Sequence, residues 1–149
     1  MPRKPLLLSS GSADDAEAEF YEALQRGDVE RLMAVWADDD DVACVHPGGP
    51  RLIGAAAIRA SFDAMFRNGA IDARPDRVRR VETLSTSVHT VIERVRVATG
   101  QGAREALVVA TNVYVKSAGG NWKLVVHHAS QGTPGESDDP AAETASTLH

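Results

Sequence analysis

Hydrophobic positions in the first half of the chain recur with a helical period. The spacing of Ala16, Phe20, Ala23 and Leu24 puts them on one face of an amphipathic helix. We expect this helix to begin at the N-cap Ser12 and to end at Gly27. The same pattern predicts a second helix over 28–36, capped by Asp28, and a third whose apolar positions run from Ile58 to Phe66.

The second half of the chain loses this period and becomes rich in Val and Thr, which favours β-strands. We expect four strands, at 77–86, 88–98, 105–116 and 122–130. Glycine-containing turns at 100–102 and 118–121 separate the last three strands and predict hairpins. Pro75 suits an edge strand or the entry to the first strand, because proline cannot donate to a neighbouring strand.

A short strand, Val42 to His46, is expected between the second and third helices. The four acids Asp38–Asp41 precede it, and the corner 47–50, Pro-Gly-Gly-Pro, closes it. Consecutive acids point in divergent directions, so we interpret them as a solvated turn and not as a metal site.

Helices followed by an antiparallel meander predict an α+β fold. The strands at 105–116 and 122–128 are apolar on both alternating faces, so both faces need cover. Helices can cover one face, and a second copy of the chain is the simplest cover for the other. We therefore expect a homodimer through the sheet face.

Length and composition fit one globular domain. Of the 149 residues, we assign 12–131 to this domain, 1–11 to a flexible arm and 132–149 to a disordered tail. The net charge of −5 argues against a nucleic-acid partner. The apolar run Leu6–Leu8 is too short for a signal core or a membrane span, and the single Cys44 fits a cytoplasmic protein.

Three stretches carry a resemblance to a known superfamily. They are FYEALQRGDVERLMAVWADDDDV, RLIGAAAIRASF and the closing WKLVVHHAS. Over residues 13–131 the chain resembles the nuclear transport factor 2-like superfamily, in its SnoaL-like and ketosteroid isomerase-like branch. The ending is also similar to the association domain of calcium/calmodulin-dependent kinases. The resemblance implies a cone, with three N-terminal helices packed on a curved, mostly antiparallel sheet around an apolar cavity.

The resemblance does not extend to the catalytic residues of ketosteroid isomerase. That enzyme uses an Asp base, with a Tyr and a protonated Asp as oxyanion donors. Its Tyr position matches Phe20, the nearest equivalent of its Asp-Pro base is His46-Pro47, displaced by two residues, and its second donor position matches Asn112. Steroid isomerisation is therefore not expected.

His46 and Asn112 are the candidate catalytic residues. His46 titrates near neutrality and suits a general base, although it could instead cap the 47–50 corner. Asn112 shares a face with apolar neighbours, so its amide needs either a ligand or a neighbouring side chain as partner. His127 and His128 must point to opposite faces, and the resemblance places His127 on the cavity side.

The expected pocket lining comprises Phe20, Trp36, Glu93, Tyr114, Val125 and His127. Strand alternation would turn Glu93 inward, where burial raises its pKa; the alternative is an outer position paired with Arg94 or Arg96. A two-His, one-carboxylate iron site from His46, His127 and Glu93 lacks support from spacing. We expect no metal, and no phosphate loop or nucleophile motif indicates a cofactor.

Two functions remain open. One is a cavity that binds a small apolar or carbonyl-containing molecule, with acid–base isomerase, dehydratase or cyclase chemistry. The other is a non-catalytic ligand-binding or oligomerisation module.

Overall fold

The computed structural model describes residues 11–137. The described chain forms three α-helices, α2 (Ala13–Arg26), α3 (Val29–Val35) and α4 (Ala55–Phe66), and a short 3₁₀-helix, η1 (Pro134–Ser137). The strands are β1 (Ala43–Val45), β2 (Arg51–Ile53), β3 (Asp72–Glu82), β4 (Thr86–Thr99), β5 (Gly102–Lys116) and β6 (Trp122–Gln131). The expected arm, except residue 11, and the expected tail beyond 137 lie outside the described residues.

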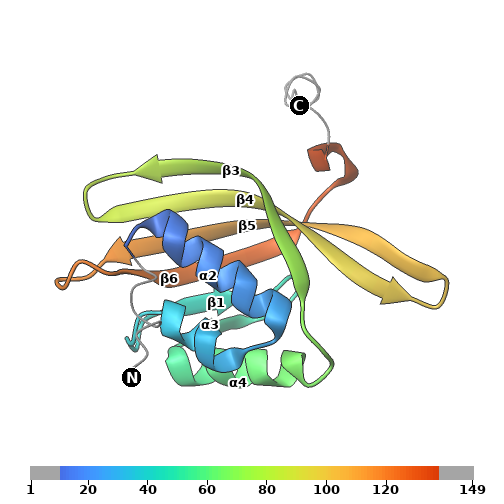
Figure 1. The fold of residues 1–149 in the computed structure, drawn as a ribbon, viewed down its shortest axis with the longest axis horizontal. Coiled ribbons are helices and arrows are strands. Elements are labelled where there is room, and N and C mark those ends of the chain that lie inside the picture. The colour runs from blue at the N-terminus through green and yellow to red at the C-terminus, as the bar shows by residue number, and fades with distance from the viewer. Residues whose placement is uncertain (1–10, 138–149) are drawn as a thin grey trace, which may run out of the picture.

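All six strands form one sheet in the order β2-β1-β6-β5-β4-β3. Every pairing is antiparallel except that of β1 with β6. The three helices lie on one side of this curved sheet, which we call its inner face (Figure 1). The α+β prediction, with three helices on a curved, mostly antiparallel sheet, is confirmed.

The helices begin and end where the sequence indicated. Ser12 Oγ accepts from the Asp15 amide at 3.0 Å, and Asp28 caps α3 through the Arg31 amide at 3.1 Å. Gly27 ends α2 in the left-handed region at φ 63°, which a residue with a side chain rarely adopts. This tight stop lets Ile71 donate its amide to Leu24 O at 2.9 Å, so the start of β3 is fixed against α2.

Two strand predictions were wrong in detail. The expected corner 47–50 is followed by β2, a strand that was not predicted and that pairs with β1. The first long strand starts at Asp72 instead of Arg77. Pro75 lies in β3, which is an edge strand and can tolerate the missing donor. A register shift between Asp76 and Arg79, with Arg77 at φ 47°, interrupts the alternation that would have revealed this strand.

The core lies between the helices and the inner face. Phe20 and Phe62 meet edge-to-face with their ring centroids 6.4 Å apart, and both are buried. The inner face of the sheet is not uniformly apolar, because Ser87, His89, Glu93, Asn112 and His127 are also buried there. Buried polar groups need partners, and these define the candidate site.

Candidate functional site

His46 follows the last residue of β1 and is half-buried. Its backbone carbonyl accepts from the Gly49 amide at 2.8 Å, which turns the chain out of the strand. The imidazole Nε2 lies 2.6 Å from Ser61 Oγ of α4, and the ring meets Phe62 edge-on at 5.0 Å. Burial lowers the pKa of His46, so its imidazole is neutral at physiological pH.

His127 lies opposite Asn112 on β5 and beside Cys44 on β1. It is buried, with Nδ1 2.6 Å from Asn112 Oδ1 and its ring 5.0 Å from that of Phe20. Burial, then the charges of His46 and His128, lowers the pKa of His127 to about 3. A second neutral imidazole therefore lies within electrostatic reach of His46.

Asn112 is fully buried, and its side-chain amide makes hydrogen bonds to other side chains. Its Nδ2 donates to the Tyr21 hydroxyl at 3.0 Å and to Glu17 Oε2 at 3.4 Å. The amide oxygen is then left to accept from His127, which puts the proton of that neutral ring on Nδ1. His127 Nε2 carries the lone pair, and it makes no hydrogen bond within the described residues.

Glu93 faces inward and is buried, and the Tyr21 hydroxyl donates to its Oε2 at 2.7 Å. Burial raises the pKa of Glu93 to about 7; the Tyr21 bond opposes this shift and the charge of Glu17 adds to it. Burial, then the charge of Glu93, raises the pKa of the Tyr21 hydroxyl, which stays protonated. Glu93 can therefore hold or release a proton near neutral pH.

The polar network continues from Glu17 of α2 to side chains of β4 and β5. Glu17 Oε2 accepts from the Tyr114 hydroxyl at 3.2 Å and lies 3.0 Å from His89 Nδ1. That last contact is close enough for an ion pair but not aligned as a hydrogen bond, because His89 Nδ1 has no hydrogen-bond partner. The opposite ring nitrogen of His89 lies 2.9 Å from Ser87 Oγ.

The sequence-predicted residues do not all meet. His46, Asn112, Glu93, Tyr114, His127 and Phe20 share the interior of the domain. Val125 lies at a register shift of β6 and packs against the core, and His128 is exposed. Trp36 lines a separate cavity of about 260 Å³ between α3 and α4.

Five residues of the network were missed by sequence reasoning: Glu17, Tyr21, Ser61, Ser87 and His89. Glu17 and Tyr21 are four residues apart on the buried side of α2, which is a detectable signal for two polar groups facing inward. The hydroxyl that is absent at Phe20 is present one residue later. His89 alternates with Glu93 on β4, so the parity that turns Glu93 inward also indicated an inward His89. Ser61 has no distinctive local pattern.

A cavity of about 640 Å³ begins at Pro47, the residue after His46. Its lining includes Val108 and Gln131, a pair on the same two strands as the Asn112–His127 pair. Within the described residues, no group of three or more His, Cys, Asp or Glu side chains could hold a metal ion. The Cys44 thiol is no nucleophile, because burial and the charge of Glu93 raise its pKa to about 12.

Comparison with known proteins assigns the family. Residues 14–134 match the model of the SnoaL-like domain. The chain belongs to the SnoaL-like family. No curated protein matches this SnoaL-like chain. No helix among the described residues is long and apolar enough to span a membrane.

Solved structures similar to this SnoaL-like domain differ in their described roles. One, from Thiobacillus denitrificans, is provisionally described as a calcium/calmodulin-dependent protein kinase type II association domain; it is 33% identical, with a TM-score of 0.74, covering 82% of this chain and 96% of that one. Another, from Streptomyces avermitilis, is provisionally described as a dehydratase of the nuclear transport factor 2-like family; it is 32% identical, with a TM-score of 0.71, covering 80% and 93%.

Proposed function

We propose that this SnoaL-like domain binds a small carbonyl-containing or apolar molecule beside His46 and transfers a proton on it. The observation that carries this proposal is the state of His46. Its imidazole is neutral and half-buried, Ser61 holds one ring nitrogen, and the other makes no hydrogen bond within the described residues. The next residue, Pro47, lines the cavity of about 640 Å³. A neutral imidazole with a free nitrogen beside a cavity-lining residue is suited to general base catalysis.

The neighbours of His46 divide the remaining roles. The amide nitrogen of Asn112 is occupied by Tyr21 and Glu17, so we assign Asn112 to positioning His127 in place of the oxyanion role expected from the sequence. Glu93, with a pKa of about 7, is the candidate proton store behind Tyr21. The chemistry that fits this set is enolisation followed by isomerisation, dehydration or cyclisation, the class to which the provisional description of the 32% identical relative belongs.

Substitution of His46 tests the proposal. We expect His46→Asn to fold normally and to weaken binding or turnover, because Asn is polar but cannot transfer a proton. The loss in rate should be roughly 10²- to 10⁴-fold, the usual contribution of general acid–base catalysis. His128→Asn is the matched control, since His128 is exposed on β6. A lower melting temperature of His46→Asn with unchanged ligand affinity would assign His46 a structural role instead.

A second candidate function is assembly without catalysis. The outer face of the sheet has no helix over it in the described chain, and it presents half-buried apolar side chains such as Val109, Val113 and Val126. The 33% identical relative is provisionally described as an association domain, which favours the same function. A homodimer through this face is compatible with either candidate, because the proposed ligand site lies on the inner side.

A further inference from the structure

The cavity of about 640 Å³ that begins at Pro47 has one charged side chain with no partner. Its charged lining residues are Arg94, Arg104 and Glu105. Arg94 donates through Nη1 to Glu105 Oε1 and through Nε to Asp76 Oδ2, both at 2.8 Å. Arg104 is exposed and makes no hydrogen bond or ion pair within the described residues. Of the charges along this cavity, that of Arg104 is therefore the one open to a ligand.

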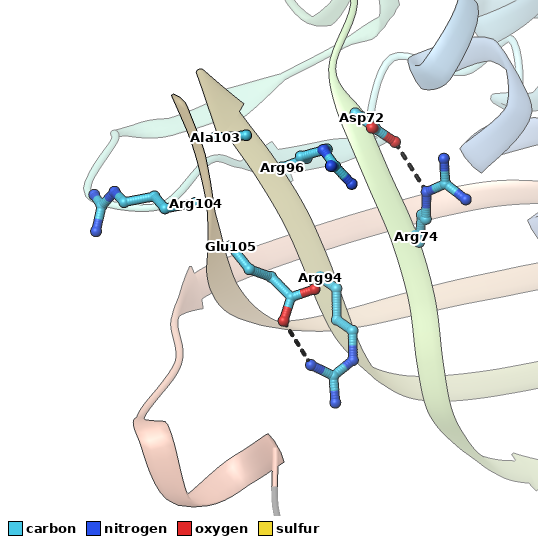
Figure 2. Close-up of a pocket in the computed structure, with 7 residues that line it drawn as sticks. All are labelled: Asp72, Arg74, Arg94, Arg96, Ala103, Arg104 and Glu105. Atoms are coloured by element: carbon cyan, nitrogen blue, oxygen red, sulfur yellow. Dashed lines mark hydrogen bonds and ion pairs between the residues drawn. The ribbon is translucent and has the colours of Figure 1, made fainter. Parts of the chain in front are cut away.

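Strand alternation places Arg104 on the same side of the sheet as His46. β5 pairs with β4 over nearly its whole length without a register shift. Side chains an even number of residues apart on a strand share a face, so Arg104 and Val108 lie on the inner face with the buried Asn112. Figure 2 shows this alternation directly, because Glu105 points to one side of β5 and Arg104 to the other.

The cavity opens where β5 loses a neighbouring strand. β6 pairs with β5 only as far as Gln131 opposite Val108, after which Gly132 donates its amide to Leu107 O at 2.8 Å. No other strand of the described chain flanks this edge of β5, and the cavity lies along it, so side chains of both faces reach the lining. The inner end of the cavity is the row of Gln131 and Val108, whose neighbour on β4 is the buried Glu93.

The rows of the inner face set how far apart the two ends of a ligand would lie. The parallel register of β1 with β6, extended by one residue, puts His46 level with Ala129, which lies opposite Ala110 of β5. From Ala110 to Arg104 the strand runs about 20 Å, at roughly 3.3 Å per residue. The two side chains bridge part of this distance. A molecule that contacts both of them must be elongated.

We propose that the His46 site takes an elongated carbonyl compound that ends in a carboxylate, and that Arg104 binds this carboxylate. The inference rests on the proposed function and names the substrate class of that same site. The planar fork of a guanidinium group matches a carboxylate in a bidentate contact. A carboxylate also carries the one charge that a single arginine balances, whereas a phosphate carries nearly two. Ala106 and Val108 offer apolar surface to the chain between the two ends.

Binding of straight-chain methyl-ketone acids to the full chain tests this inference. The series begins with levulinate and continues with longer homologues that keep the ketone at one end and the carboxylate at the other. Each acid is compared with its own methyl ester, which retains the ketone and the chain but not the charge. Calorimetric titration at low ionic strength gives both affinities without any turnover. We expect the best-fitting acid to bind at least about tenfold more tightly than its ester, as for other hydrogen bonds to a charged group.

Two arginine variants locate the contact. Arg104→Gln should abolish the preference for the acid and leave the affinity for the ester unchanged, because only the carboxylate contact is lost. Arg96→Gln is the matched control, since Arg96 is exposed on the neighbouring strand β4 but does not line this cavity. It removes the same charge and should keep the preference. His46→Asn should keep it too, because binding of the carboxylate does not require proton transfer.

Equal binding of every acid and its ester by the native chain would overturn the inference, and so would the absence of binding by any acid of the series. A preference that survives Arg104→Gln, or that Arg96→Gln removes as fully, would also overturn it. These results leave proton transfer by His46 untouched, because deuterium uptake by uncharged ketones measures it separately. Conversely, deuterium uptake that His46→Asn leaves unchanged, beside a preference that depends on Arg104, would contradict the proposed function alone.

Discussion

At the scale of single residues, Glu93 and His127 have pKa values shifted in opposite directions by the same interior. Burial keeps Glu93 protonated up to a pKa of about 7 and His127 neutral down to a pKa of about 3. Between about pH 4.5 and 6.5, the folded chain holds a proton on Glu93 that the unfolded chain has lost, and lacks one on His127 that the unfolded chain has gained. The two groups therefore give opposite slopes to the free energy of unfolding as a function of pH, and these slopes cancel over this range.

Glu93→Gln should expose the contribution of His127. Without Glu93, we expect the free energy of unfolding to rise steadily from pH 3 to 6.5, whereas the native chain should show a plateau above about pH 4.5. The contribution of Glu93 to the free energy of unfolding falls by roughly 3 kcal/mol as the pH rises from 4.5 to 7, because its raised pKa makes ionisation in the folded state unfavourable. Urea denaturation at a series of pH values measures this, and a plateau that persists in Glu93→Gln would contradict it.

His127→Gln should give the opposite slope. Gln can still donate to Asn112 Oδ1 but does not titrate, so the destabilising contribution that His127 makes as the pH falls from 6.5 to 3 should be absent. The free energy of unfolding of this variant should instead fall by about 3 kcal/mol from pH 4.5 to 7, because only Glu93 remains. The same urea series tests this, with His128→Gln as the exposed control. Parallel curves for His127→Gln and the native chain would show that His127 is not buried in a neutral state.

At the scale of elements, the sequence predicts the parts whose periodicity is long and uninterrupted. The helix at 55–66 and the hairpins of β4, β5 and β6 show their pattern over ten or more residues. β2 has only three residues, and β3 contains Pro75 and a register shift, so neither shows a clear alternation. A second shift between Val113 and Tyr114, paired with β6, brings both Leu124 and His127 inward, which strand parity alone would not allow.

The candidate site was predictable only in part, for a related reason. Residue type and strand alternation suggest His46, Glu93, Asn112 and His127. Their partners depend on contacts between distant elements, such as the Tyr21–Glu93 bond across 72 positions. No local pattern encodes such a contact, so the network that fixes proton positions became visible only in the structure.

The cap of α3 makes a prediction at this scale. α3 has only seven residues, and Asp28 Oδ1 satisfies the amide of Arg31 at its start. Asp28→Ala should lower the free energy of unfolding by about 1 kcal/mol, the usual cost of losing an N-cap. Asp40→Ala, in the exposed acidic turn, is the matched control and should have no measurable effect. Equal stabilities of the two variants in urea denaturation would contradict the role of the cap.

At the scale of the whole molecule, the helices of the described chain cover one side of the sheet and leave its outer face uncovered (Figure 1). That face carries half-buried apolar side chains. If a second copy covers this face, a charged side chain at its centre should separate the copies. Val113→Glu should convert a dimer to a monomer at micromolar concentration in analytical ultracentrifugation, because the introduced carboxylate would be buried without a partner. Lys116→Glu, at an exposed end of β5, is the control. A native chain that sediments as a monomer would contradict the interface.

The proposed acid–base function is tested most directly by exchange of carbon-bound hydrogen. Small carbonyl compounds are incubated with the protein in D₂O, and deuterium uptake beside the carbonyl group is measured by mass spectrometry. We expect the native chain and His128→Asn to accelerate uptake for at least one compound, and His46→Asn to lose roughly 10²- to 10⁴-fold of that rate. Equal uptake with His46→Asn, or no uptake from any compound that binds beside His46, would contradict the proposal.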